Sequence, residues 1–233
     1  MKKKKSIHEI ALLVIIVILL LAFFVQFADK KEESKISYNV SPSMSFFITS
    51  ANPGRGGDLG GLAGADAYCT TLAKEAGVPG KTWRAYLSTV DKNGTPGVNA
   101  KDRIGNGPWY NAHGELVARN LEELHGINAL SKTTALSEKG EIISGRGDTI
   151  NMHDILTGSN AQGTSVATST DTTCNNWTSS DVGSAYVGHH DRIGINESAP
   201  MKSWNSSHMT RGCSLPALRS TGGAGLFYCF ATK

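Results

Sequence analysis

The sequence lacks an excess of charge outside its first residues. The formal net charge is +3, and residues 1–27 account for all of it with four lysines and one glutamate. Residues 28–233 are therefore neutral as a whole. Binding to nucleic acid depends on clusters of Lys and Arg that face phosphates. We expect no nucleic-acid partner for this chain.

The sequence also lacks the short motifs of common hydrolases. It contains no Gly-x-Ser-x-Gly motif, which would place a nucleophilic serine on a strained turn. Its histidines do not follow the spacing of a closed zinc site either. We therefore expect a protein that is not an enzyme, and a metal-dependent hydrolase is the least favoured alternative.

Long apolar runs are absent except near the N-terminus. The segment Ile10–Phe27 contains no charged residue and follows four lysines, Lys2 to Lys5. At about 1.5 Å per residue its length just crosses a hydrocarbon core of about 30 Å. Basic residues remain on the cytoplasmic side of such a helix. The pattern predicts a cytoplasmic tail over residues 1–9 and an uncleaved signal anchor over residues 10–28, with a cleaved signal peptide as the alternative.

The segments that follow differ in composition. Residues 29–43 are charged and polar, which predicts a solvated stalk. Residues 44–233 have ordinary globular composition and suit one domain, periplasmic or extracellular in either case. Within that domain, residues 93–225 are rich in Gly, Asn, Ser and Thr, so we expect a loop-rich region of short strands there.

Four segments of the domain carry clear periodic patterns. Aromatic, β-branched or alternating runs predict strands, and apolar residues at helical spacing predict a helix that buries Cys69. A strand, a helix and a strand, then an irregular region and a last buried strand, are typical of an α+β domain. The predicted strands are residues 45–49, 83–87 and 225–231, and the predicted helix is residues 62–76.

Cysteine is scarce, and all four cysteines lie in the part of the chain predicted to be exported. An even number of cysteines in an oxidising compartment is expected to pair. Four cysteines allow three connectivities, so the sequence alone predicts two disulfides without saying which residues they join. The four are Cys69, Cys174, Cys213 and Cys229.

Several short segments follow one another in an informative order along residues 45–231. They are Trp83–Ser88, Val98–Gly105, Pro108-Trp109, Leu156–Ser159 with Gly163, Cys174–Trp177, Trp204–Ser206, Cys213 and Tyr228-Cys229. In this order they resemble the C-type lectin-like fold. Within that fold they are most similar to endostatin, the C-terminal domain of certain collagens, and to bacterial exported proteins loosely called lectins. The resemblance implies a binding domain whose long loops recognise a ligand.

The resemblance also implies a disulfide pattern. In the family, the first cysteine lies on the first helix and joins the last cysteine, on the final strand. The middle two cysteines join across the loop region. Carried over to this sequence, the pattern is Cys69–Cys229 and Cys174–Cys213.

Calcium is the one cofactor that the resemblance raises. C-type lectins that bind sugar through calcium use a Glu-Pro-Asn-like loop and a Trp-Asn-Asp strand, because Ca²⁺ takes six to eight oxygen ligands. Here the nearest segments are Asn196-Glu197-Ser198 and Trp204-Asn205-Ser206, with serine in place of the ligating aspartate. The missing charged ligand argues against a calcium site, and we expect Trp204 to pack in the core.

One polar run contains His189, His190 and Asp191. Successive side chains on a strand point to opposite faces, so the two histidines do not easily share one metal ion. We favour the interpretation that these residues hold the loops together by hydrogen bonds. As an alternative, His190 or Asp191 could join groups from elsewhere, namely His208 or His153 with Asp154.

Taken together, the patterns predict a binding module that Ile10–Phe27 anchors in the membrane. Its loops, over residues 144–224, are expected to recognise a glycan or a cell-envelope ligand. The alternative is a structural module that docks an envelope protein without binding sugar. The residues expected to contact the ligand are Asp191, Asn196, Glu197, Asn205 and His208.

Overall fold

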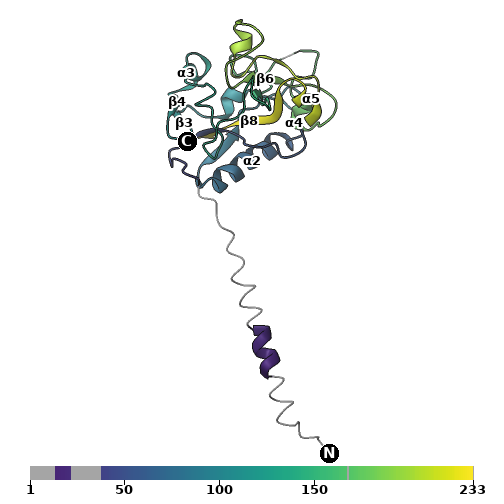
Figure 1. Ribbon diagram of the computed structural model, residues 1–233. Helices are drawn as coiled ribbons and strands as arrows, with labels where there is room; N and C mark the ends of the chain where they lie inside the picture. Colours follow the sequence, from purple (N-terminus) through teal and green to yellow (C-terminus); the bar gives the residue numbers. More distant parts are fainter. Residues whose placement is uncertain (1–13, 22–37, 167, 233) are drawn as a thin grey trace, which may run out of the picture. The chain divides into compact units, whose positions relative to one another are not determined.

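The computed structural model describes residues 14–21, 38–166 and 168–232. Residues 14–21 are helical with exposed side chains. Within the described part of the chain, no helix is long and apolar enough to cross a membrane. The rest of the predicted tail, anchor and stalk up to residue 37 lies outside the described residues. A separate compact unit begins at Tyr38 (Figure 1).

The centre of the compact unit is a six-stranded sheet in which β8 (Gly223–Thr232) has three partners. Two strands, β1 (Phe46–Ile48) and β2 (Thr82–Ala85), pair with it antiparallel. Phe230 of β8 stands opposite a residue of each, so β1 and β2 flank β8 on opposite edges. These three strands carry the alternating and aromatic runs of the sequence, and the strands predicted there are confirmed. Figure 1 shows β8 crossing the middle of the domain.

The first half of β8 pairs with β5 (Asp154–Leu156), and this is the parallel pair in the sheet. β6 (Tyr186–His189) and β7 (His208–Met209) extend the sheet beyond β5 with antiparallel pairing. These strands are short and carry polar residues. They lie in the region expected to be loop-rich, and their pairing brings distant polar segments together.

Helix α2 (Gly61–Glu75) packs against β2 and confirms the predicted helix. Its buried residues are Ala65, Cys69, Leu72 and Ala73, which recur at helical spacing. The helix ends where the backbone N–H of Ala76 donates to Leu72 and Gly77 adopts a positive φ of 87°. The apolar face of α2 thereby covers one side of the sheet.

The opposite side of the sheet is covered by aromatic rings. Phe230 of β8 lies 4.9 Å from Phe46 and 5.3 Å from Trp109, measured between ring centroids. Trp204 packs 4.8 Å from Tyr86 and is only 3% exposed, which confirms that it lies in the core. Aromatic pairs at these distances stabilise a core beyond the area they bury.

The remaining elements are short, as expected for a loop-rich region. Ile142, in the apolar stretch of residues 141–143, forms an isolated bridge to Leu136. The elements are η2 (Ala100–Arg103), β3 (Trp109–Tyr110), β4 (Leu116–Ala118), α3 (Leu121–His125), α4 (Cys174–Trp177), η3 (Pro200–Lys202) and α5 (Leu215–Arg219).

Segment α4 is a left-handed turn, with φ of 46° at Cys174, 58° at Asn175, 55° at Asn176 and 65° at Trp177. Left-handed backbone is unfavourable by about 1–2 kcal/mol for each residue with a side chain. Tertiary contacts hold the turn: the indole N–H of Trp177 donates to the Ser88 carbonyl at 2.7 Å, and the ring is buried. The local sequence does not predict this conformation, because its stability comes from distant contacts.

Two disulfides join Cys69 to Cys229 and Cys174 to Cys213. This is the pairing that the resemblance implies. The first links α2 to β8, and the second ties the left-handed turn to the segment before α5. Disulfides persist in oxidising compartments, so the two bonds indicate an extracytoplasmic domain.

Candidate functional site

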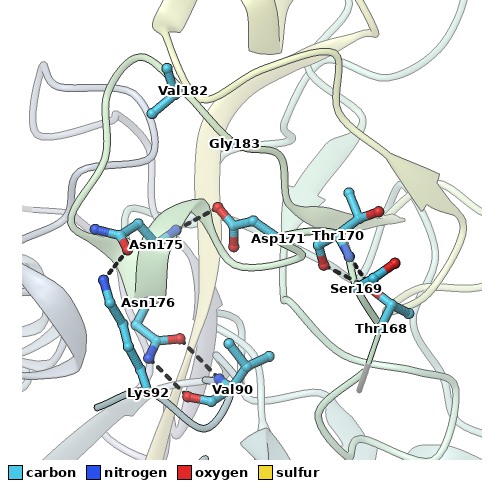
Figure 2. Close-up of a pocket in the computed structure, with 10 residues that line it drawn as sticks. All are labelled: Val90, Lys92, Thr168, Ser169, Thr170, Asp171, Asn175, Asn176, Val182 and Gly183. Atoms are coloured by element: carbon cyan, nitrogen blue, oxygen red, sulfur yellow. Dashed lines mark hydrogen bonds between the residues drawn. The ribbon is translucent and has the colours of Figure 1, made fainter.

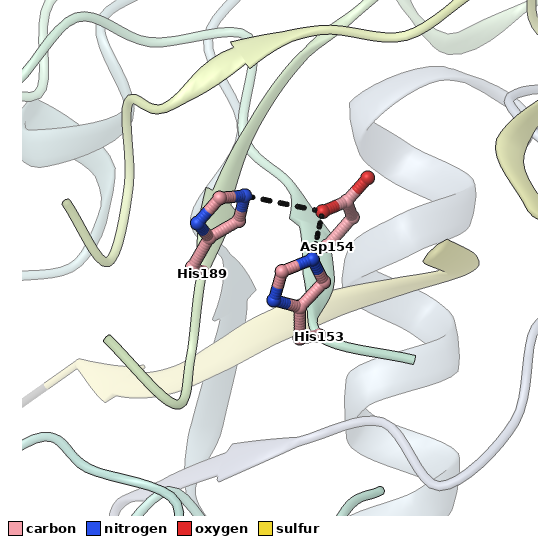
Figure 3. A group of neighbouring side chains, drawn as sticks. All are labelled: His153, Asp154 and His189. Carbon is pink, nitrogen blue, oxygen red and sulfur yellow. Dashed lines mark ion pairs between the residues drawn. The ribbon is translucent and has the colours of Figure 1, made fainter. Parts of the chain in front are cut away.

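Histidine and aspartate side chains gather at one end of strands β5, β6 and β7 (Figure 3). Asp154 of β5 stands directly opposite His189 of β6, so both side chains lie on the same face of the sheet. His208 of β7 stands opposite Val187, two residues before His189, and therefore shares that face. His153 joins from the residue before β5. Strand register thus brings the neighbours His153 and Asp154 together with His189 and His208 from two later strands.

The side chains converge on a single oxygen. Oδ1 of Asp154 lies 3.1 Å from Nε2 of His153, 3.3 Å from Nε2 of His189 and 3.5 Å from Nε2 of His208. The side chains of Asp154, His153 and His189 are 1–2% exposed, while that of His208 is 29% exposed. Gly222 makes room for this group, because a Cβ there would lie 3.0 Å from the His153 ring.

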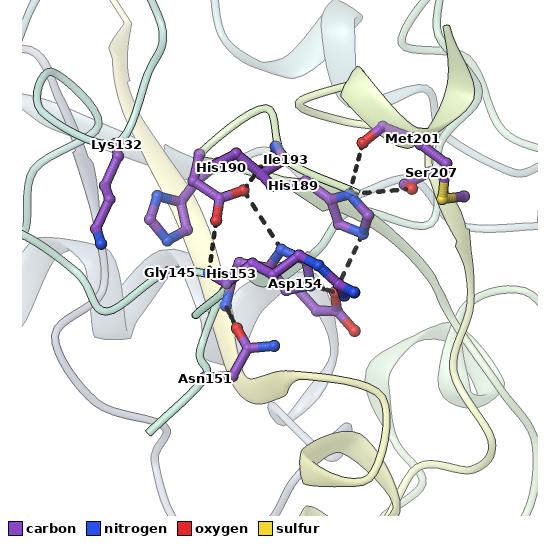
Figure 4. A network of polar contacts seen from close by, with 12 residues as sticks. Lys132, Gly145, Asn151, His153, Asp154, His189, His190, Ile193, Met201 and Ser207 are labelled. Atoms are coloured by element: carbon purple, nitrogen blue, oxygen red, sulfur yellow. Dashed lines mark hydrogen bonds and ion pairs between the residues drawn. The ribbon is translucent and has the colours of Figure 1, made fainter. Parts of the chain in front are cut away.

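A second carboxylate, Asp191, lies beside the other ring nitrogen of His153. Figure 4 shows the polar contacts around His153, Asp154 and His189. Asp191 accepts backbone N–H groups from Arg146 at 2.7 Å and Ile193 at 3.0 Å, and faces Nδ1 of His153 at 3.3 Å. His153 therefore lies between two buried carboxylates. Asp191 is one of the predicted ligand contacts, and here its oxygens are engaged inside the domain.

The environment shifts the pKa values of this group. Burial lowers the pKa of His153, but the carboxylates of Asp154 and Asp191 outweigh it and raise that pKa to about 9. Burial raises the pKa of the Asp154 carboxyl, but the imidazoles beside it hold that pKa well below its usual range. Asp154 raises the pKa of His208.

His190 points away from the group, as strand geometry requires. Its Nε2 faces the Ser144 carbonyl at 3.3 Å, and burial lowers its pKa to about 4. The two adjacent histidines therefore have different surroundings. His189 faces Asp154, and His190 forms a neutral contact with a neighbouring loop.

Ser207, His189 and Asp154 follow one another like a catalytic triad, but the central histidine lacks a free base. Nδ1 of His189 lies 3.4 Å from the Ser207 hydroxyl and 2.8 Å from the Met201 carbonyl. A carbonyl only accepts, so Nδ1 carries the proton and donates it to Met201. It cannot then take a proton from Ser207, and this arrangement does not support a serine nucleophile.

The other predicted ligand contacts lie apart from the group. Asn205 is 1% exposed, and its amide donates to the Tyr86 hydroxyl at 3.0 Å and accepts from Ser203 at 3.0 Å. Asn196 is exposed and accepts from the backbone of Ser198. Glu197 has an 87% exposed side chain and forms an ion pair with Lys202. The structure therefore gives Asn205 an internal contact network, while Asn196 and Glu197 face solvent.

Two open hollows lie in the loop region. The first, of about 720 Å³, runs along the segment from Ala199 to Ser207, and Tyr186 and Trp204 are among the residues that line it. The second, of about 520 Å³, lies beside the left-handed turn between Lys92 and Thr168 (Figure 2). Hydroxyl and amide groups line both hollows, a surface suited to a polar ligand.

The sequence offered His208, or His153 with Asp154, only as groups that His190 or Asp191 could join. It did not predict that His189 completes the group. The signal was present as two local pairs, His153-Asp154 and His189-His190, but the strand register that unites them is non-local. The sequence matches no protein-family model, and a search of curated proteins finds no significant match.

Proposed function

We propose that this chain is a membrane-anchored, extracytoplasmic binding module of the C-type lectin-like, endostatin-like class. Its loop region recognises a glycan or another ligand of the cell envelope. Three features support the proposal: an α+β domain with a mixed sheet, two disulfides with the pairing implied by the resemblance, and a long loop region that carries open polar hollows.

The hollow beside β6 is the observation that carries the proposal. Ser203, Ser206 and Ser207 line it, together with the partly exposed Tyr186. Sugars present hydroxyls for hydrogen bonding and C–H faces for aromatic rings, so this combination suits a carbohydrate. A concave surface on loops fixed by a disulfide-braced scaffold is a usual place for recognition.

The contacts around the hollow favour metal-free recognition over a calcium site. The carboxylate of Glu197 is paired with the Lys202 ammonium, and the amide oxygen of Asn205 accepts a hydrogen bond from Ser203. Calcium needs several oxygen ligands that converge on one point. The oxygens that the resemblance would assign to calcium are engaged with other groups.

The alternative function, docking of an envelope protein, is favoured by exposed isoleucines near the same hollow. Ile127 is 92% exposed, and Ile195 is 74% exposed. Their loops lie close together, because the Arg192 guanidinium donates to Asn128 at 2.7 Å and to the Leu130 carbonyl at 3.3 Å. Exposed apolar side chains on adjoining loops are typical of a protein contact.

The test is glycan-array binding by the oxidised full chain in mild detergent, in buffer with and without added calcium. The variant Ser206→Trp places a large ring in the first hollow. The matched control Ser169→Trp places the same ring in the second hollow, which Figure 2 shows. We expect glycan binding that is independent of calcium, lost in Ser206→Trp and retained in Ser169→Trp.

Each other outcome changes the assignment. Binding that requires calcium would restore a calcium-lectin mechanism despite Ser206. Loss of binding only in Ser169→Trp would move the ligand to the second hollow. A folded, disulfide-bonded chain that binds no glycan would reject the sugar ligand and favour a protein partner, which an Ile127→Ser variant would then weaken.

A further inference from the structure

The buried histidine group has an arrangement that hydrogen bonding alone does not explain. Nε2 atoms of His153, His189 and His208 all face Oδ1 of Asp154 at 3.1–3.5 Å. Yet neither oxygen of Asp154 accepts a well-directed hydrogen bond from the described residues, and Nε2 of His189 is likewise without a hydrogen-bond partner there. Buried polar atoms are normally paired, so the position of these atoms favours the binding of a cation.

The contact of each Nδ1 atom determines where that imidazole carries its proton. In all three rings Nδ1 faces an oxygen that accepts its proton, so a metal ion that displaces any proton on Nε2 would meet a lone pair directed at the centre of the group. A histidine that binds a metal almost always donates its other N–H to a carboxylate or a carbonyl in this way. The acceptors are Asp191 Oδ1 at 3.3 Å from His153, the Met201 carbonyl at 2.8 Å from His189 and the Met209 carbonyl at 3.1 Å from His208.

The ligand atoms of His153, Asp154 and His189 all lie within 4.8 Å of one another, and Nε2 of His208 lies 3.5 Å from the Asp154 oxygen, which places it to complete a coordination shell. Ligands at about 2.0–2.1 Å from a tetrahedral zinc ion lie about 3.3 Å from one another along each edge. The three measured distances from Asp154 Oδ1, 3.1, 3.3 and 3.5 Å, scatter around that value. Lone pairs in such a shell aim at the centre and not at one another. This explains why the contacts are short but poorly directed as hydrogen bonds.

Charge supports the same conclusion. Asp154 and Asp191 are two carboxylates whose side chains are 1% and 0% exposed. Arg192, the cation next to Asp191 in the chain, donates instead to Asn128 and to backbone carbonyls. Buried charges are normally paired or coordinate a metal. A protonated His153 would balance one of these carboxylates, whereas a single divalent ion would balance both.

We propose that this group is a zinc site, with Nε2 of His153, His189 and His208 and Oδ1 of Asp154 as ligands. Three imidazoles and one carboxylate suit zinc, whereas calcium takes oxygen ligands. Four protein ligands complete a tetrahedron, so the site is structural and leaves no position for a substrate. It fastens β5, β6 and β7, and it is independent of the ligand recognised by the nearby hollow.

The first experiment measures metal in the full chain, purified in mild detergent with a tag that contains no histidine. Elemental analysis should find one zinc per chain. After removal with a chelator, the folded chain should take up one equivalent of added zinc sulfate. Absence of bound zinc together with failure to take up zinc would overturn the proposal, and stoichiometric copper or iron at these residues would overturn the choice of metal.

Variants locate the ion. His208→Ala is the main test, because that side chain is partly exposed and its loss leaves the core packed; zinc affinity should fall by more than about 100-fold. Asp191→Asn, which removes the charge behind His153, should weaken binding by about 10–100-fold. The control His113→Ala changes an exposed histidine outside the group and should leave affinity unchanged.

Two readouts separate loss of zinc from loss of folding. Circular dichroism and tryptophan fluorescence should show native structure in His208→Ala without zinc. Cobalt(II) bound to the metal-free chain should give the strong visible absorption of a tetrahedral site. Wild-type zinc affinity in a folded His208→Ala chain, or the weak spectrum of octahedral cobalt, would contradict the proposed ligands.

Discussion

Two parts of the sheet, one at each end of β8, are stabilised by different interactions. Where β1 and β2 pair with β8, buried rings such as Phe46 and Phe230 fill the space. Where β5, β6 and β7 extend the sheet, the end of the strands carries His153, Asp154 and His189. Burial of apolar area is non-directional, whereas a buried polar group is stable only when each atom meets a partner.

This difference explains how the polar half of the sheet, strands β5, β6 and β7, is stabilised. Its strands have two to four residues and few apolar side chains, so burial alone gives them little stability. Side-chain hydrogen bonds, such as Thr157 to the Asn205 carbonyl at 2.6 Å, and the disulfide Cys174–Cys213 take that role. Loops held in this way keep their shape while presenting polar groups to solvent.

The largest effect on the free energy of unfolding is expected from removing the disulfide of the apolar half of the sheet, strands β1, β2 and β8. The Cys69–Cys229 bond spans 160 residues, and loop-closure entropy predicts a loss of about 5 kcal/mol in Cys69→Ala/Cys229→Ala. The Cys174–Cys213 bond spans 39 residues, and the same relation predicts about 4 kcal/mol. Urea unfolding of both double variants measures the difference. A larger loss in the second would show that native-state contacts, and not the closed loop, determine the effect.

The next largest loss of stability is expected from a change in the aromatic core. Phe230→Ala removes a fully buried ring that packs on Phe46 and Trp109, and we expect a loss of about 3–5 kcal/mol in the free energy of unfolding. Urea unfolding followed by tryptophan fluorescence measures it. Ile127→Ala, at a side chain that is 92% exposed, is the control and should change stability by less than about 0.5 kcal/mol. Equal losses in both variants would contradict the assignment of Phe230 to the core.

A smaller effect is expected from the polar half. Asn205→Ala removes the hydrogen bonds to the Tyr86 and Ser203 hydroxyls, which should lower the free energy of unfolding by about 1–3 kcal/mol. Thermal and urea unfolding measure it, with Asn196→Ala as the exposed control. Unchanged stability together with lost ligand binding would show that Asn205 contacts the ligand and that its internal contacts contribute little.

The smallest effect is expected at the surface. Glu197→Ala removes an ion pair between the Glu197 carboxylate and Lys202. The Glu197 side chain is 87% exposed, so the free energy of unfolding should change by less than about 0.5 kcal/mol. A double-mutant cycle with Lys202→Ala isolates the pair and should give an interaction energy close to zero in physiological salt. A coupling above about 1 kcal/mol would mean that the pair orders the loop beside the hollow.

The two halves also differ in how far sequence predicts them. The run Ser45–Thr49, the helix that carries Cys69 and the last strand have apolar periodicity, and the structure confirms all three. The polar half has no such period, because residues such as His189 and His208 contribute through register between strands and not through a repeating pattern. Sequence identified the residues of the histidine group as candidates, but their convergence is a product of non-local pairing.

The position of β8 in the chain has a consequence for the order of folding. β1, β2 and β5 all precede their shared partner, so none of them can complete its pairing until residues 223–232 have been synthesised. Contacts of such long sequence separation form slowly. A domain whose sheet needs its last strand is expected to stay unfolded while the chain crosses a membrane, which is the state that translocation requires.

The order of the cysteines has a related consequence. Cys174 and Cys213 can meet before Cys229 has emerged, so oxidative folding is expected to begin in the loop region and end at the sheet.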